Sequence, residues 1–414
     1  MSGKHSQANR MAPLDGLRGF ASLYVIVAHL FPLWRGRGIG ERVGRTLLDL
    51  GWSGVDLFFV LSGFLITGIL LKSKGDSARR YFGIFYARRF LRVFPVYYLM
   101  LVVLLVVVPR VPFFARWNYF WVVQGSGLPY WTYLSNWGEQ VNAGTHWFLC
   151  VCWSLAIEEQ YYVVWPLTVW FTSRRGLAIA SIGLLGASAA LRAGLFLGLG
   201  WPVERVFHMT FTHLDGIALG SLLAIAWRDR VRYGWILDRF AGLAVPLGAA
   251  LLAVVLYAGL TRGEGAPLSY TPALIVGFPL VVLFYGSLLI RSLVRPGAVR
   301  AIFSTPFLRM LGKYSYAAYL FQFAAKWIVD LALAVAARRV PFVPPFTSPV
   351  GLFFKFVLQV TASYGLAALS WKVLEGPINA FKETTPLLNP PAKPAVISLG
   401  PAPALGGSAS LSAG

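Results

Sequence analysis

Charged residues are scarce in this 414-residue sequence: Asp, Glu, Lys and Arg make up 13% of it, about half of the fraction found in soluble domains. Hydrophobic residues make up 57%, including 30 Phe, 18 Tyr and 15 Trp, and the mean hydropathy is +0.64. So few polar residues do not suffice to coat a water-facing surface. The composition therefore excludes an ordinary soluble enzyme and a disordered chain.

Cysteine is nearly absent as well. Cys150 and Cys152 lie within an apolar run and are too few for a disulfide scaffold. Their spacing fits neither a redox CxxC pair nor a zinc ligand set. We interpret both as buried apolar residues, and we expect no metal site and no resident cofactor.

Long hydrophobic runs are what the sequence has in abundance. A helix needs about 20 mostly apolar residues to cross a bilayer. The first run is not a cleaved signal peptide, because Asp15 and Arg18 stand at its entrance and no small-residue cleavage site follows it. The sequence predicts an all-α polytopic membrane protein with about ten transmembrane helices, at approximately 16–34, 50–71, 93–109, 146–171, 177–199, 210–227, 240–260, 271–290, 311–337 and 351–371.

The net charge of +21 follows the topology of a membrane protein. If the N-terminus is cytoplasmic, Lys and Arg are more than twice as frequent in the cytoplasmic loops and ends as on the other side. Both termini are thus predicted to be cytoplasmic, and no nucleic-acid partner is expected. We divide the chain into an N-terminal arm (1–13), a transmembrane domain (14–382) and a Pro-, Ala-, Gly- and Ser-rich cytoplasmic tail (383–414) that should be disordered.

The first predicted helix carries an unusual polar stripe of Asp15, Arg18, Ser22 and His29. At 100° per residue, His29 lies about 20° around the helix from Arg18 and roughly 16 Å farther along its axis. Ionisable groups at this depth are costly and mark functional sites. The alternative is that His29 only forms a hydrogen bond with a neighbouring helix.

Carboxylates stand in two further apolar runs. Asp56 shares a helix face with Gly63 and Thr67, which suits close approach of another helix or a ligand, and a buried Asp56 requires a partner. Glu158 and Glu159 are adjacent, and two neighbouring carboxylates are not both ionised cheaply in hydrocarbon. One of them is expected to pair with Arg or His, to line a cavity, or to fix helix packing through an ion pair.

The segment between the second and third predicted helices is basic and aromatic, with Arg88, Arg89 and Arg92 near its end. Guanidinium groups bind phosphate oxygens in a two-pronged geometry. The segment is therefore predicted to bind a phosphorylated donor that arrives from the cytoplasm. The alternative is an anchor at the lipid headgroups.

Four segments follow one another along the chain: LDGLRGFASLYVIVAH (14–29), DLFFVLSGFLI (56–66), FYARRFLRVFPVYY (85–98) and WSLAIEEQYYVVWPL (153–167). In this order they resemble the membrane-bound acyltransferase-3 family, whose members transfer acyl groups, commonly acetyl, to sugars and other hydroxyl acceptors. Weaker similarities are THLDGIALGSLLA, YSYAAYLFQ and the late EGP, and together the segments span roughly residues 10 to 382.

The resemblance implies roles for single residues. His29 matches the essential histidine of the family's first helix, and Arg89 and Arg92 match its RxxR pair, which is associated with use of the acyl donor. Glu158 falls in the family's EEQ segment. Members often have Arg where His213 stands and His where Gln322 stands, so neither position is assigned a catalytic role.

We expect acyl-CoA, most simply acetyl-CoA, as the co-substrate. Its phosphates would dock on the arginine cluster, and its pantetheine arm would run along the polar stripe of the first helix. Asp15 and Arg18 would orient one another and guide the donor. The predicted donor-binding residues are Arg18, Arg88, Arg89 and Arg92.

His29 would act as general base on the acceptor hydroxyl, or form a transient acyl-histidine. Asp56 or Glu158 would orient the imidazole, and the sequence does not choose between them. The predicted catalytic residues are His29, Glu158, Asp56 and Asp15.

The expected location is the bacterial inner membrane, where lipid and a carbohydrate or other hydroxyl acceptor are the partners. The segments show no match to the extracytoplasmic hydrolase-like domain fused to some family members, which leaves open a separate extracytoplasmic or glycan-export partner. Two rival functions are a proton-coupled transporter of a sugar or small metabolite and a non-catalytic scaffold. The acceptor's identity and the acyl length stay open.

Overall fold

The computed structural model describes residues 2–31, 38–112, 127–137, 147–261, 272–339 and 348–388. Within these ranges the chain is helical throughout and has no strand, apart from one isolated bridge between Lys74 and Asp76 in a turn. The prediction of an all-α fold is confirmed.

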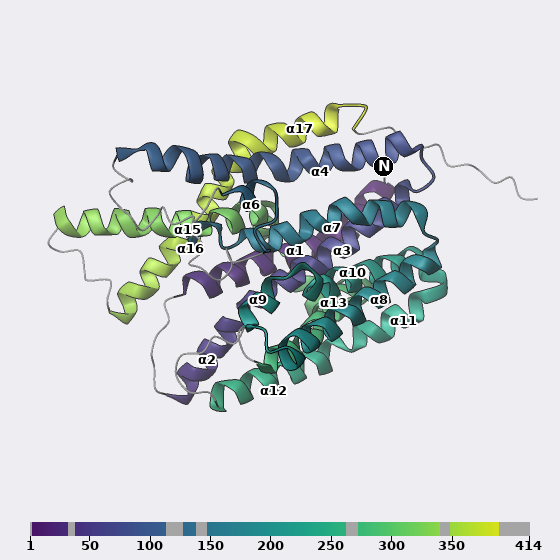
Figure 1. Cartoon of the computed structure of the whole chain (residues 1–414), viewed down its shortest axis with the longest axis horizontal. Helices are drawn as coiled ribbons and strands as arrows, with labels where there is room; N and C mark the ends of the chain where they lie inside the picture. The colour runs from purple at the N-terminus through teal and green to yellow at the C-terminus, as the bar shows by residue number, and fades with distance from the viewer. Residues whose placement is uncertain are drawn as a thin grey trace, which may run out of the picture.

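Twelve helices of 11 or more residues form the body of the described structure (Figure 1). They are α1 (Ser2–Leu30), α2 (Ile39–Asp49), α3 (Gly54–Ser73), α4 (Ala78–Leu101), α7 (Cys152–Phe171), α8 (Arg174–Ala193), α10 (Leu214–Arg228), α11 (Arg230–Gly242), α12 (Ala244–Thr261), α13 (Pro272–Val294), α15 (Pro306–Arg339), α16 (Pro349–Ser370), with α17 (Gly376–Thr384) as a thirteenth at the end of the described chain. Short helical segments join them: η1 (Leu50–Ser53), η2 (Val102–Val107), η3 (Val108–Arg110), α6 (Leu128–Trp131), η6 (Trp147–Leu149), η7 (Gly194–Gly198), α9 (Val203–His208), η8 (Thr210–Thr212), α14 (Ala298–Phe303) and η10 (Trp371–Glu375).

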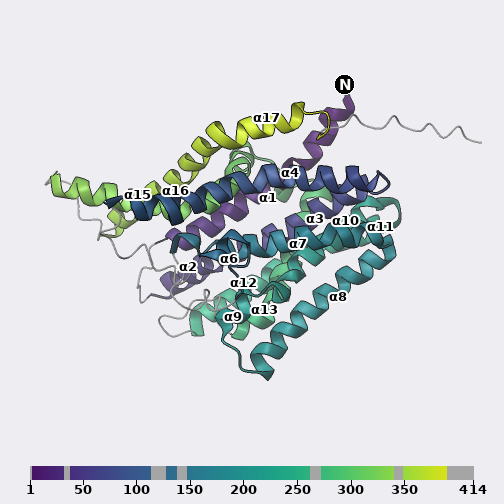
Figure 2. The same ribbon diagram turned by 45° about the horizontal axis from the view of Figure 1, so that its top comes forward.

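The long helices form a bundle in which α1 and α3 lie near the centre (Figures 1 and 2). The most extensive contacts join α1 to α15, α3 to α10, and α15 to α16. Helices α4 and α17 lie along one edge of the bundle and α11 and α12 along the opposite edge (Figure 1). The centre of this bundle is where the site residues described below are held.

Eight helical stretches among the described residues are long and apolar enough to cross a membrane. Helices α7 and α10 correspond to the two other spans predicted from the sequence, and both pack inside the bundle. A polytopic membrane protein is thus confirmed, whereas the number of ten spans stays a prediction.

Both ends of the described chain lie at the same end of the bundle (Figure 1). Arg88 Nε donates to Leu388 O at 2.7 Å, which fixes the last described residue beside α4. The two termini therefore agree with one side of a membrane, and its assignment to the cytoplasm stays a prediction. Helix α1 begins at Ser2, so the expected N-terminal arm continues the first helix; the predicted disordered tail lies, from residue 389, outside the described residues.

The prediction that the basic segment between the second and third helices is a loop is wrong, because most of the segment is helical. Only the turn after Ser73 is non-helical, and α4 already begins at Ala78. Ser77 caps this helix by accepting the N–H of Arg80, which stabilises a helix start that apolar periodicity does not reveal. The arginine cluster therefore projects from a helix. Two other expected loops likewise contain helices, α2 and α11.

Glycine allows α3 and α10 to pack backbone against backbone. A Cβ atom on Gly63 would lie 2.0 Å from Ile217 O, and one on Gly220 would lie 2.0 Å from Val60 O. The same close approach joins α1 to α15, where a Cβ on Gly312 would lie 1.9 Å from Asp15 O. Small residues allow such contacts in membranes, and the prediction that Gly63 suits close approach is confirmed.

Gly63→Ala should therefore destabilise the protein by about 1–3 kcal/mol, because α3 and α10 would have to separate. Gly68→Ala is the matched control on the same helix, where no atom lies within 4 Å of the added Cβ. That control should be neutral or slightly stabilising, since alanine favours helix by roughly 1 kcal/mol. Thermal unfolding in detergent checks both variants, and equal melting temperatures would contradict the packing.

Candidate functional site: a basic cavity below a histidine–glutamine pair

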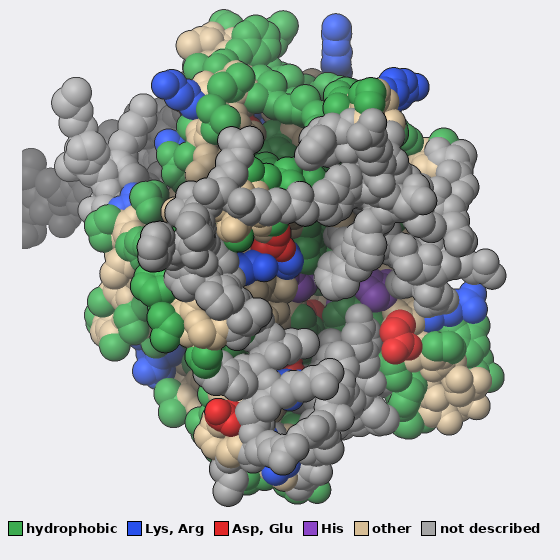
Figure 3. All heavy atoms as spheres, turned by 90° about the vertical axis from the view of Figure 1, so that its left-hand side faces the viewer, with side chains coloured by type: hydrophobic (Ala, Val, Ile, Leu, Met, Phe, Trp, Pro, Cys, Tyr) green, Lys and Arg blue, Asp and Glu red, His purple; other side chains and the backbone are tan. Residues whose placement is uncertain are grey.

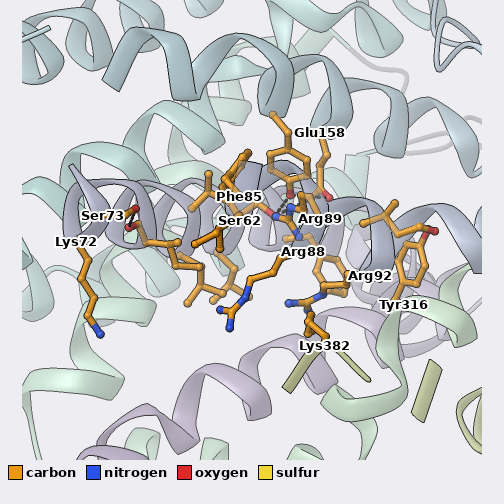
Figure 4. A pocket seen from close by; sticks show the side chains of 18 of the residues that line it. Ser62, Lys72, Ser73, Phe85, Arg88, Arg89, Arg92, Glu158, Tyr316 and Lys382 are labelled. Carbon is orange, nitrogen blue, oxygen red and sulfur yellow. Dashed lines mark hydrogen bonds between the residues drawn. The ribbon is translucent and has the colours of Figure 1, made fainter. Parts of the chain in front are cut away.

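A cavity of about 940 Å³ opens among α1, α3, α4, α7 and α15 (Figure 4). It begins at the α3–α4 turn around Lys74 and reaches Ser154 and Tyr319. Two acidic residues, Asp76 and Glu158, line it, against eight basic ones. These are Arg18, Lys72, Lys74, Arg80, Arg88, Arg89, Arg92 and Lys382. The excess of cations makes it a cavity for an anionic ligand.

All four predicted donor-binding residues line this cavity. Arg88, Arg89 and Arg92 come from neighbouring turns of α4, and Arg18 comes from α1. Figure 4 shows Arg88 and Arg92 extending toward Lys382 of α17, while Arg89 lies beside Glu158. Their predicted role in binding an acyl donor stays a prediction.

Glu158 forms the polar wall of the cavity. Its Oε1 accepts from Ser62 Oγ at 2.7 Å and its Oε2 accepts from Tyr162 Oη at 3.1 Å (Figure 4). The Arg89 guanidinium lies 3.8 Å above the Tyr162 ring, which adds a cation–π contact. The expectation that one carboxylate of the pair lines a cavity is thus confirmed: it is Glu158, while Glu159 is absent from the cavity wall.

Lys74 sits in the α3–α4 turn at the mouth of this cavity. Its ammonium donates to Val169 O at 2.5 Å and to Thr172 O, the carbonyls at the end of α7. Burial, and then the nearby Arg174 guanidinium, lower the pKa of Lys74. The contact fastens α7 to the turn that leads into α4.

A second cavity of about 650 Å³ adjoins the first and shares four wall residues with it. Asp15 lines this second cavity together with Arg18, at the end of the bundle where α1 begins. The structure thus brings Asp15 and Arg18 to one wall, and their predicted mutual orientation stays a prediction. The shared residues are Arg18, Arg92, Tyr316 and Lys382.

His29 lies farther along α1 and is bound to Gln322 of α15. The distance between His29 Nδ1 and Gln322 Oε1 is 2.9 Å, and Phe323 lies against the imidazole with ring centroids 5.3 Å apart. Gln322 is fully buried, and its Nε2 donates to Tyr319 O at 2.9 Å. Because the amide nitrogen faces this carbonyl, the amide oxygen faces His29. Nδ1 therefore carries the hydrogen in this arrangement, and Nε2 keeps its lone pair.

Tyr319 connects the two parts of the site. It lines the inner end of the cavity, where its hydroxyl lies 2.8 Å from Ser154 Oγ, and it stands three residues before Gln322 on the same helix. Just under one helical turn, a rise of about 4.5 Å, therefore separates this wall residue from the partner of His29 along α15. His29 itself is exposed rather than part of the cavity wall. The face at which α1, α4 and α15 end is hollowed, and His, acidic and basic side chains lie in the hollow (Figure 3).

Neither Asp56 nor Glu158, which were predicted to orient His29, forms a hydrogen bond with it among the described residues. The imidazole binds Gln322, and Glu158 binds Ser62 and Tyr162. Asp56 is 1% exposed and does not line the cavity, and its Oδ1 has no partner among the described groups. The catalytic roles assigned to these carboxylates stay predictions without contact to the histidine.

Asp56 neighbours a fully buried ion pair that the sequence did not reveal. Arg192 Nη2 lies 2.6 Å from Asp215 Oδ2, and Arg192 Nη1 donates to Thr212 O. The Arg192 guanidinium also lies 4.7 Å from the Phe278 ring centroid. An arginine alone in an apolar run signals such a partner, but the sequence does not tell which helix supplies it.

Gln322 was not identified from the sequence as the partner of His29, because family members often have histidine at this position. The available signal was a polar amide within an apolar helix, since a buried polar group needs a hydrogen-bond partner. The two cysteines are free thiols. Cys152 is fully buried, as predicted, whereas Cys150 is only partly buried.

The fold and the site together define an integral membrane protein with a basic cavity at one end of the bundle and a histidine beyond it. A family model described as "Acyltransferase domain", of the acyltransferase-3 type, matches residues 12–368. The chain belongs to this acyltransferase family. No solved structure matches the chain.

Two relatives are similar over most of the chain. The "Peptidoglycan O-acetyltransferase OatA" of Listeria monocytogenes is 30% identical over an alignment of 380 residues, which covers 88% of this chain and 55% of the relative. The "Putative peptidoglycan O-acetyltransferase YrhL" of Bacillus subtilis is 30% identical over an alignment of 388 residues, which covers 90% of this chain and 56% of the relative. The chain thus spans little more than half the length of these relatives.

Gln322→Leu should shift the tautomer equilibrium of the His29 imidazole away from the Nδ1–H form. Without the amide oxygen, the Nδ1–H form of His29 loses about 1 kcal/mol, so its ratio to the Nε2–H form should fall roughly fivefold. ¹⁵N NMR of histidine-labelled protein measures this ratio. Gln359→Leu is a control that removes another buried glutamine, from α16, and should leave His29 unchanged. An unchanged ratio in Gln322→Leu would contradict the assignment.

Proposed function

We propose that the protein is an integral membrane O-acyltransferase of the bacterial inner membrane. It transfers an acyl group, most simply acetyl, from acyl-CoA to a hydroxyl of an envelope carbohydrate, with His29 as general base. The observation that carries this proposal is the basic cavity whose inner end lies just under one helical turn from the His29–Gln322 pair.

The cavity suits coenzyme A in charge and in size. Its eight basic side chains complement the phosphates of the donor, and about 940 Å³ falls in the range of small-molecule sites. The inner end is less charged, with Phe58, Ser154 and Tyr319, which suits a pantetheine arm. The donor then enters from the end of the bundle that carries the arginines, and its thioester points toward Gln322 and His29.

His29 supplies the base in this proposal. Nε2, with its lone pair, takes the proton of the acceptor hydroxyl as the oxygen attacks the thioester carbonyl. The C–S bond breaks, the acyl group moves to the oxygen, and the coenzyme A thiolate takes up the proton from the imidazolium. An acyl-histidine intermediate is the second route. Nε2 then attacks the thioester first and the coenzyme A thiolate leaves; the acceptor oxygen next takes the acyl group from Nε2, and the hydroxyl proton passes to the thiolate.

Membership of the acyltransferase family supports acyl transfer rather than the rival function, proton-coupled transport. Both relatives carry peptidoglycan O-acetyltransferase in their names, which supports acetyl as the group and peptidoglycan as the acceptor. The exposed position of His29 is consistent with a bulky acceptor that approaches from outside the bundle.

His29→Ala should lower the rate of acyl transfer by about 10²–10⁴-fold, because the general base is lost. The assay follows acetyl-CoA consumption and acetylated peptidoglycan fragments in membranes with equal amounts of intact protein. His208→Gln is the control, a histidine of α9 that lines neither cavity. Activity of His29→Ala within a few-fold of the wild type would remove His29 from the mechanism.

Arg88→Gln and Arg92→Gln should each raise the KM for acetyl-CoA by about 10–100-fold, since a charge-assisted hydrogen bond contributes roughly 1.5–3 kcal/mol. The turnover number should change less. Arg79→Gln is the matched control: it is exposed on the same helix and lies outside the cavity wall. If all three variants behaved alike, the cluster would act only as a surface charge.

A further inference from the structure

A row of polar side chains leads outward from His29 along α15. Gln322, Lys326 and Asp330 follow one another at four-residue intervals, so they share one helix face and rise about 6 Å per step. Gln322 holds His29, and Asp330 stands roughly 12 Å beyond it toward the end of the helix. The row passes from the buried partner of the histidine to partly exposed groups.

Helix α16 completes the outer end of this row. Lys326 Nζ lies 2.7 Å from Asp330 Oδ2, and Lys355 Nζ lies 2.9 Å from Asp330 Oδ1. Gln359 Nε2 donates to Asp330 Oδ1 at 2.7 Å. We call these four residues the outer polar cluster: Lys326, Asp330, Lys355 and Gln359.

The outer polar cluster holds more hydrogen-bond donors than its own carboxylate takes up. Each ammonium has three N–H groups, and the bond to Asp330 takes one of them. The side chains of Lys326, Asp330 and Lys355 are 39%, 28% and 30% exposed, so a ligand can reach them. Two cations against one anion also leave a net positive charge that a purely structural ion pair does not need.

Apolar rings flank the same region. Phe323 lies against the His29 imidazole, and Phe356 of α16 packs edge-on against Phe31 with centroids 5.1 Å apart. Polar groups beside aromatic faces suit a sugar, which offers hydroxyl edges and C–H faces. Helix α15 ends on the hollowed face, where basic, acidic and histidine side chains lie in the hollow (Figure 3).

We propose that the outer polar cluster is the acceptor-binding site and that it takes a saccharide. The ammonium groups of Lys326 and Lys355 donate to oxygen atoms of the sugar, Asp330 keeps both ammonium groups in place, and the row presents a hydroxyl to His29. This inference rests on the proposed function, because it assigns the second substrate of the same reaction.

Binding is tested separately from transfer. The probe is a mixture of soluble muropeptides from digested peptidoglycan, added to purified full-length protein without acetyl-CoA and detected by native mass spectrometry. The wild type should bind the probe. The double variant Lys326→Met/Lys355→Met should bind at least tenfold more weakly, whereas Lys326→Arg/Lys355→Arg should stay within about threefold of the wild type.

Kinetics and stability separate a substrate role from a structural one. The Met double variant should raise the KM for muropeptide at least tenfold with the KM for acetyl-CoA unchanged. Arg295→Met, which removes a partly exposed ion pair with Asp238 elsewhere in the bundle, is the control and should change neither KM. If the double variant fails to fold, Lys355→Gln alone carries the same expectation, with a smaller effect.

Two results would overturn the inference. The first is a wild type that does not bind the muropeptide probe. The second is a Met variant that melts at a lower temperature but keeps the muropeptide affinity and KM, which would make the cluster a structural ion pair. If the wild type binds the probe but transfers no acetyl group, the proposed function is contradicted, whereas the saccharide-binding site is supported.

Discussion

The cost of placing a charge in hydrocarbon is the constraint on which this structure depends. Several ionisable groups within the bundle have specific partners: Arg192 pairs with Asp215, and Glu158 accepts from Ser62 and Tyr162. Asp56 differs, because its Oδ1 has no partner among the described groups. Helices can meet these partners only at short distances, which the backbone contacts at Gly63 and Gly312 provide. The polar contacts therefore depend on helix packing, because they require the close approach of helices that the glycines permit.

The site divides into two chemical environments along one axis. At one end, basic side chains surround a cavity that suits a phosphorylated donor. At the other end, His29 and a partly exposed polar row suit a hydroxyl-bearing acceptor. Tyr319 and Gln322 lie between them on α15, so the proposed reaction joins substrates that approach from opposite directions. Such an arrangement explains why the chain places its histidine and its arginines in different halves of the bundle.

The sequence predicted much of this arrangement, because hydrophobic length and charge scarcity are properties of the chain itself. The membrane-spanning class and the arginine cluster followed from runs and spacing, and lining a cavity was one of the alternatives left open for the pair Glu158 and Glu159. The partner of His29 did not, since the distance between α1 and α15 is set by tertiary packing between residues about 290 positions apart. The helical form of the basic segment was missed for a local reason: its start depends on the Ser77 cap rather than on apolar periodicity.

Helix α15 runs from Pro306 to Arg339 without an internal proline. It carries Tyr319, Gln322, Lys326 and Asp330. A wall residue at the inner end of the cavity, the partner of the histidine and half of the outer polar cluster therefore belong to one continuous helix. The spacing between these groups cannot adjust to a substrate by bending at a hinge within the row. A sliding or rotation of α15 against α1 would shift all of them together, which would couple the occupancy of one end of the molecule to the geometry at the other.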